Sequence, residues 1–132
     1  MLRFPVAALV AVAVVGWAAP AVAAPAPDED AVRTVLNRMN TSYNGMDFGG
    51  FAANLCPDML QSAGFAANWY ASRKTDGPTK ITVNSVSVRG DRAVANVRFE
   101  AANRDDPKTL DIDLIRNGGE WKACRYNPGR AV

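Results

Sequence analysis

The sequence of 132 residues contains no histidine and only two cysteines. The missing histidine excludes every arrangement that uses an imidazole as a catalytic base or a metal ligand. A zinc site would need thiolates and carboxylates alone, and no second cysteine pair stands at ligand spacing. Glycine-rich phosphate loops and nucleophile elbows are also missing. We therefore expect no metal, no cofactor and no catalytic residue of a recognisable type.

An excess of one charge is missing as well. Fifteen lysines and arginines stand against thirteen acidic residues, which gives a net charge of +2, and both signs are scattered along the chain. Such a mixed pattern gives no electrostatic reason to expect nucleic acid or an anionic membrane as a partner.

The start of the chain has the features of a secretory signal peptide. Arg3 supplies the positive charge, residues 4–19 are apolar and uncharged, and Ala21-Val22-Ala23 has the small-x-small pattern that signal peptidase cuts. We predict cleavage after Ala23, no stable membrane span afterwards, and a secreted or cell-envelope protein. A retained transmembrane anchor is the alternative, although the apolar run is near the short end of the ~17 to 25 residues that a span requires.

The predicted organisation is a signal peptide over 1–23, a Pro/Ala spacer over 24–27, one domain over 28–128 and a tail over 129–132. The domain contains both cysteines, Cys56 and Cys124. In an oxidising compartment, an even and minimal cysteine count favours one structural disulfide. A reactive thiol or a metal-binding pair remains the alternative.

The first half of the domain has helical patterning. Apolar residues recur at spacings of three and four, which predicts a helix over 28–44 that ends at Asn44-Gly45; they are Val32, Val35, Leu36, Met39 and Tyr43. A second short helix is expected from Asp47 through Leu55. A third helical stretch is expected over 57–73, with an interruption at Gly64.

The second half alternates apolar and polar residues, which predicts four strands over 80–88, 92–102, 108–116 and 120–126. The alternation changes phase within the first strand, so we expect a bulge at Asn84-Ser85. Hairpin connections give an antiparallel meander with one face free for the helices. The predicted class is therefore α+β, with N-terminal helices packed on a curved four-stranded sheet.

Three short motifs carry a resemblance to a known family: residues 43–48 (YNGMDF), Leu55-Cys56 and residues 119–124 (GEWKAC). With this order of elements, the chain resembles the NTF2-like superfamily, and most of all its small exported actinobacterial members. The resemblance implies a cone of helices over a bent sheet, often around an apolar cavity, with a disulfide from the helical half to the last strand. Strict alternation puts Cys124 opposite Trp121, so a bulge or strong twist is expected near Ala123.

The superfamily includes isomerases, dehydratases and cyclases that place a carboxylate or histidine in the mouth of the cone. A desolvated carboxylate base is the form open to this chain, with Tyr43 or Tyr70 as hydrogen-bond donor. Helix-cap positions and polar strand positions favour structural roles for the carboxylate candidates, which are Asp47, Asp58, Asp111 and Asp113.

Aromatic residues are the other candidates for a site. Trp69 and Tyr70 are adjacent on a helix and cannot both point inward, so one of them is expected at a rim. The residues predicted to contact a ligand or partner are Tyr43, Trp69, Tyr70 and Trp121.

The function that we predict is a non-catalytic binding or interaction module of the cell envelope, holding a small apolar ligand or an envelope protein. The alternative is an isomerase or cyclase type of enzyme with a carboxylate base. A homodimer through the open sheet face is a further expectation, and uncovered Val94 and Ile115 would be its sign.

Overall fold

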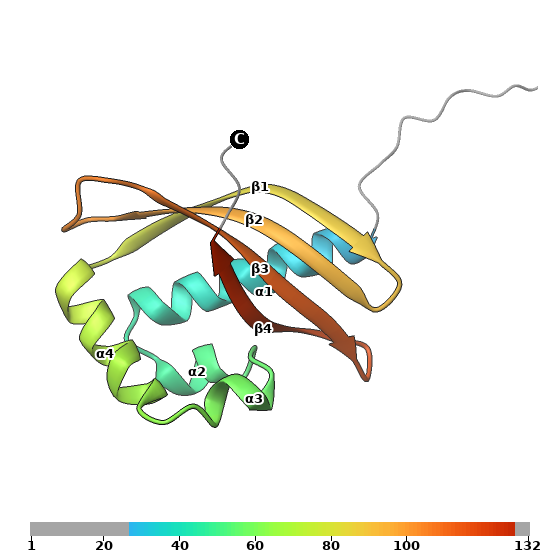
Figure 1. The fold of residues 1–132 in the computed structure, drawn as a ribbon, viewed down its shortest axis with the longest axis horizontal. Helices are drawn as coiled ribbons and strands as arrows, with labels where there is room; N and C mark the ends of the chain where they lie inside the picture. Colours follow the sequence, from blue (N-terminus) through green and yellow to red (C-terminus); the bar gives the residue numbers. More distant parts are fainter. Residues whose placement is uncertain (1–26, 129–132) are drawn as a thin grey trace, which may run out of the picture.

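Within the described part of the chain, four helices precede four strands (Figure 1). A computed structural model describes residues 27–128, so the predicted signal peptide and tail lie outside the described residues. The helices are α1 (Pro27–Asn44), α2 (Phe48–Ala52), α3 (Pro57–Leu60) and α4 (Phe65–Asp76). The strands are β1 (Thr79–Arg89), β2 (Arg92–Ala101), β3 (Lys108–Asn117) and β4 (Glu120–Pro128). The predicted α+β class is confirmed.

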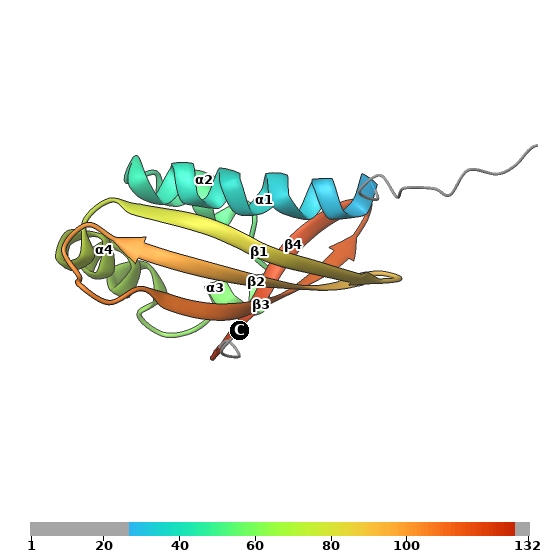
Figure 2. The same cartoon turned by 90° about the horizontal axis from the view of Figure 1, so that it is seen from above.

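The strands form one open antiparallel sheet in the order β1-β2-β3-β4, and the sheet is visibly twisted in Figure 2. The pairing of β1 with β2 shifts between Val83 and Ser85, which confirms the predicted bulge at Asn84. The extra residue restores the phase of the strand, so that apolar side chains before and after it pack on the same core: Ile81, Val83, Val86 and Val88.

A second bulge lies in the edge strand β4. Asp113 pairs with Arg125 while the next residue, Leu114, pairs with Ala123, so Cys124 is the extra residue. The predicted irregularity near Ala123 is therefore confirmed. Ala123 stays in the core, and Cys124 forms a disulfide with Cys56, which precedes α3.

The first helix runs along β1 and covers one face of the sheet (Figure 2). It buries Val32, Val35, Leu36 and Met39, as the apolar spacing predicts. The helix begins at Pro27, one residue before the predicted start, and Asp28 therefore lies within the first turn, where it pairs with Arg116 of β3. None of the helices among residues 27–128 is long and apolar enough to cross a membrane.

The middle helices differ from the prediction at their ends. The second helix ends at Ala52, so the prediction that it reaches Leu55 was wrong. Leu55 instead forms a bridge with Ala123, whose backbone N–H donates to the carbonyl of Asn54 at 2.8 Å. Pairing with the sheet edge replaces the last helical turn. The predicted interruption at Gly64 is confirmed, because this residue adopts φ = 76° immediately before α4.

Asn44 joins the end of α1 to the start of β1. Its side-chain amide donates to the carbonyl of Thr79 at 2.8 Å, and its side-chain oxygen accepts from the Thr79 N–H at 2.8 Å. Thr79 is buried, so Asn44→Ala would leave two buried backbone groups unpaired. We expect the free energy of unfolding to fall by about 2 kcal/mol in urea denaturation. The matched control is Asn37→Ala at an exposed position of the same helix. Equal losses in the two variants would contradict the prediction.

Candidate functional site

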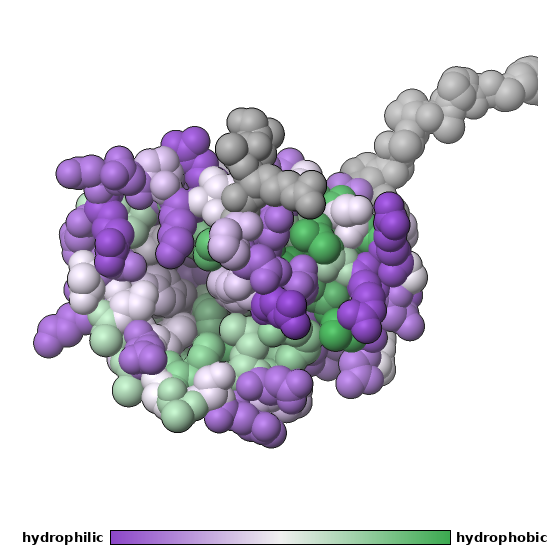
Figure 3. All heavy atoms as spheres, in the orientation of Figure 1, coloured by the Kyte–Doolittle hydropathy of each residue, from purple (hydrophilic) through white to green (hydrophobic). Residues whose placement is uncertain are grey.

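A cavity of about 680 Å³ lies between the helices and the inner face of the sheet. Figure 3 shows the face of the molecule that is hollowed, with hydrophobic surface below the hollow and hydrophilic side chains above it. The volume falls in the range of about 300–1,000 Å³ that is usual for small-molecule sites. The apolar side chains of the wall include Leu36, Met39, Phe51, Met59, Phe65, Trp69, Ile81, Val97, Phe99, Leu110 and Ile112.

The cavity occupies one end of the sheet, and the core is closed at the other end, where the side chains of β2 are small. There, Ala93 and Ala95 of β2 are 2% and 0% exposed, and these small residues belong to the same closed core as Val32 of α1. The lining begins further along the helix, at Leu36, and continues to Tyr43. The first half of α1 therefore closes the core, and the second half forms a wall of the cavity.

The charged residues of the lining lie where the end of α4 meets the hairpin that joins β2 to β3, and we call this part of the rim the mouth. Arg104 of this hairpin forms an ion pair with Asp76, with 2.5 Å between Nε and Oδ1. The backbone N–H of Asn103 donates to the Asp76 carbonyl at 2.9 Å, which fixes the hairpin to the helix. Asp106 and Lys108 complete the charged groups of the lining. Two acidic and two basic side chains thus meet at the mouth, and their formal charges cancel.

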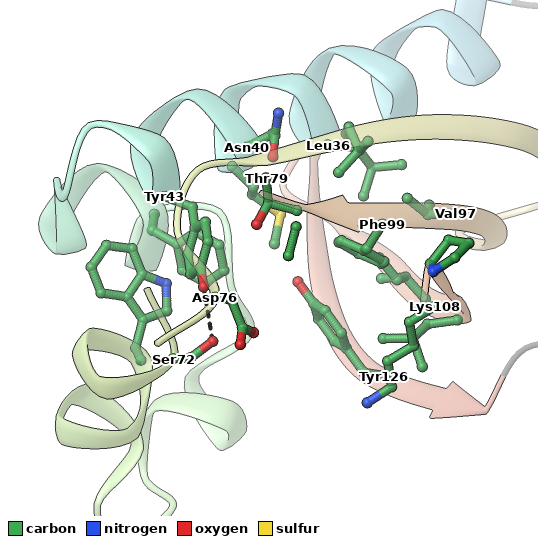
Figure 4. Close-up of a pocket in the computed structure, with 18 of the residues that line it drawn as sticks. Leu36, Asn40, Tyr43, Ser72, Asp76, Thr79, Val97, Phe99, Lys108 and Tyr126 are labelled. Atoms are coloured by element: carbon green, nitrogen blue, oxygen red, sulfur yellow. Dashed lines mark hydrogen bonds between the residues drawn. The ribbon is translucent and has the colours of Figure 1, made fainter. Parts of the chain in front are cut away.

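Tyr126 brings a hydroxyl group into the cavity from the apolar wall of the sheet. Figure 4 shows its ring extending from β4, with the hydroxyl directed toward the space between the sheet and α4. No group within residues 27–128 forms a hydrogen bond with this hydroxyl. Burial raises the pKa of Tyr126 well above that of an ordinary phenol. At neutral pH the group is protonated, as any phenol is, and it can donate or accept a hydrogen bond.

A pair of hydroxyls lies across the cavity from Tyr126, nearer to solvent. The Tyr43 hydroxyl and Ser72 Oγ are 2.8 Å apart and share a hydrogen bond (Figure 4). Because only one of the two hydrogens lies between the oxygens, the other remains free to donate. Arg73 fixes the neighbouring backbone, since its Nε donates to the Tyr43 carbonyl at 3.2 Å.

Trp69 separates the cavity from the outer surface of the helices. It is 6% exposed, and its ring packs against four other aromatic rings with centroids 5.0–5.4 Å away: Tyr43, Phe48, Phe51 and Tyr70. Its Nε1 is buried without a hydrogen-bond partner among the described residues. The surrounding ring faces are weak acceptors for this N–H group.

The structure brings two of the four predicted contact residues to the cavity. Tyr43 and Trp69 line it, whereas Tyr70 is 43% exposed on the outer side of α4. Trp121 is buried below the guanidinium of Arg116, which lies 5.3 Å from the ring centroid, and it is outside the lining. Trp69 and Tyr70, which are adjacent in the sequence, thus point in different directions, as expected. The sequence alone does not say which of the two points inward.

The four carboxylates considered from the sequence lie outside the lining. Asp47 caps α2 by accepting from the Gly50 N–H at 3.0 Å, and Asp58 lies in the first turn of α3. Asp111 and Asp113 accept from neighbouring asparagines in the sheet. Within residues 27–128 there is no cluster of three metal-binding side chains. The carboxylates that do line the cavity are Asp76 and Asp106, and neither was among the candidates from the sequence.

Comparisons with known proteins identify the fold. No family model and no curated protein matches the chain. Among solved structures, it is similar to an NTF2-like protein of unknown function from Shewanella oneidensis, with 13% identity, a TM-score of 0.57, and 76% of this chain and 98% of that chain covered. A second such protein, from Shewanella baltica, matches at 12% identity and TM-score 0.54, covering 76% of this chain and 94% of that one. The chain has the NTF2-like fold.

The Kfla4162 protein from Kribbella flavida is a third similar structure, with 15% identity, a TM-score of 0.55, and 78% of this chain and 90% of that chain covered. At such identities the similarity shows the NTF2-like fold alone. The function of this chain has to be argued from its own cavity.

Proposed function

We propose that this protein is a non-catalytic binding module that holds a small apolar ligand in its cavity. The cavity itself is the observation that carries the proposal, because about 680 Å³ of space has mostly apolar walls. An apolar molecule gains about 25 cal/mol for each Å² that it removes from water there. The ligand would enter through the hollow seen in Figure 3.

We further propose a secreted or cell-envelope location. The disulfide between Cys56 and Cys124 supports it, because such bonds persist in oxidising compartments. An envelope protein at the mouth and a homodimer through the outer sheet face remain expectations. For the dimer, Val94 is 42% exposed, but Asn96 and Asp111 beside it form a polar row with 2.8 Å between their side chains.

Filling the cavity tests the proposal. Leu110 of β3 lines the cavity, so Leu110→Trp would place an indole in the space that the ligand needs. We expect the variant to bind the neutral dye N-phenyl-1-naphthylamine at least about tenfold more weakly than the wild type, measured by the fluorescence of the bound dye. Overpacking of a filled core costs about 1–3 kcal/mol, but here the added ring enters a void.

The matched control is Val94→Trp, which adds the same indole on the outer face of the same sheet. This variant should bind the dye like the wild type. Both variants are checked for native circular dichroism. Equal dye binding by the two variants would contradict the proposed site.

An isomerase or cyclase type of enzyme is the second candidate function. The observation in its favour is that a carboxylate, Asp76, lines the same cavity as the hydroxyls of Tyr43 and Ser72. We place it second because Arg104 already engages that carboxylate. The test measures the exchange of the α-protons of 2-tetralone for deuterium in D₂O. Exchange that the protein catalyses and that Asp76→Asn abolishes would favour the enzyme over the binding module.

A further inference from the structure

The hydroxyl of Tyr126 points into the cavity from a wall of the sheet that is otherwise apolar. Its neighbours in the sheet are Ile112, with which it is paired across β3 and β4, and Leu110, which lies two residues along β3. Both of these side chains line the cavity. Within the described residues, the hydroxyl has no hydrogen-bond partner, in contrast to the Tyr43 hydroxyl, which is held by Ser72.

An unpaired donor in such a place discriminates between ligands. A hydrocarbon that filled the cavity would displace water from the Tyr126 hydroxyl and offer nothing in return, so the lost hydrogen bond would count against binding. A ligand with a polar group at the same place, such as a carbonyl oxygen that accepts from the hydroxyl, would restore a hydrogen bond. Discrimination of this kind is stronger than what an extra methylene group achieves.

The charges around the cavity bear on the charge of the ligand. The mouth holds Asp76 and Asp106 together with Arg104 and Lys108, so its formal charges cancel. Arg104 is already paired with Asp76. Around the Tyr126 ring, the same burial that raises the pKa of the phenol would also penalise an ionised ligand group.

We infer that the ligand of this cavity is an uncharged, mostly apolar molecule with one polar group, such as a carbonyl oxygen, that forms a hydrogen bond with the hydroxyl of Tyr126. The inference rests on the binding function proposed above and adds the chemical class of the ligand. Tyr126 is then the residue that determines specificity, and the apolar wall supplies most of the affinity.

Three probes of similar shape separate the terms of this inference. Benzophenone carries a carbonyl group where diphenylmethane carries a methylene group, and 4-benzoylbenzoate adds a carboxylate to benzophenone. Each probe competes with N-phenyl-1-naphthylamine for wild-type protein, for Tyr126→Phe and for the control Tyr70→Phe, which removes an exposed hydroxyl outside the cavity. Thermal melting checks that both variants remain folded.

We expect Tyr126→Phe to weaken benzophenone binding about five- to tenfold, as the loss of one hydrogen bond predicts. Diphenylmethane should change less than about twofold, and Tyr70→Phe should affect neither probe. Wild-type protein should bind 4-benzoylbenzoate at least about tenfold more weakly than benzophenone.

Three results would overturn the inference. If Tyr126→Phe weakens the binding of benzophenone and of diphenylmethane equally, the inferred hydrogen bond between ligand and Tyr126 is contradicted. The proposed binding function would still stand. Tighter binding of 4-benzoylbenzoate would show that the mouth selects an anion. No binding of the dye to the wild type would overturn the proposed binding function, and the inference with it.

Discussion

Replacing both Cys56 and Cys124 with alanine is expected to lower the free energy of unfolding by about 4 kcal/mol. The disulfide joins positions 68 residues apart, so it restricts a long loop of the unfolded chain. In the folded protein, the backbone around Cys56 keeps its own hydrogen bond to the carbonyl of Ala123 at 2.8 Å. Most of the loss should therefore come from the freer unfolded state. Urea denaturation of the two proteins measures the difference.

Removal of both cysteines leaves no free thiol to react, and reduced wild-type protein provides the matched control. The reduced wild type and the double variant should unfold at nearly the same urea concentration. A double variant within about 1 kcal/mol of the oxidised wild type would show that the bond adds little. Since small domains are stable by only about 5–15 kcal/mol, the expected loss is a large share of the total.

Trp69→Ala is expected to lower the free energy of unfolding by about 3 kcal/mol, near the lower limit for a buried tryptophan. The ring packs against four other aromatic rings, and their contacts would be lost together. One side of Trp69 already faces the cavity, where it has fewer neighbours to lose. Urea denaturation measures the effect. Unfolding is monitored by circular dichroism, because the variant lacks one of the tryptophans whose fluorescence would otherwise report it.

Two variants test the cause of that loss. Trp69→Phe keeps an aromatic ring among the same neighbours and should lose less than half as much. Tyr70→Ala removes the adjacent ring, which is 43% exposed, and should cost less than about 1 kcal/mol. If Tyr70→Ala costs as much as Trp69→Ala, the aromatic packing does not centre on Trp69.

The parts of the fold that follow from local chemistry were predictable. The spacing of Val32, Val35 and Leu36 defines the buried face of α1, because a helix repeats every 3.6 residues. The alternation of apolar and polar residues changes phase at Asn84, which indicates a bulge. Without an extra residue there, the apolar side chains before and after it would lie on opposite faces of the sheet. Gly64 interrupts the helices because it takes a positive φ that other residues avoid.

The cavity was less predictable, because its lining depends on contacts between distant segments. Tyr126 was missed although an irregularity near Ala123 was expected. Alternation that counts Cys124 as an ordinary strand residue puts Tyr126 on the outer face, and the bulge moves it to the inner face. Asp76 was missed because its role depends on Arg104, 28 residues away on a hairpin. The direction of Tyr70 was open for the same reason: adjacency says that one ring points outward and only packing decides which.

The extra residue in β4 keeps two properties of the molecule separate. Cys124 is the inserted position, and the strand pairs in the same register with β3 on both sides of it, with Ala123 opposite Leu114 and Tyr126 opposite Ile112. Deleting this one residue would remove the covalent link to Cys56, but Arg125 would then follow Ala123 in regular alternation and Tyr126 would still face the cavity. A lineage could thus lose the crosslink by deletion or by substitution and keep the polar group inside.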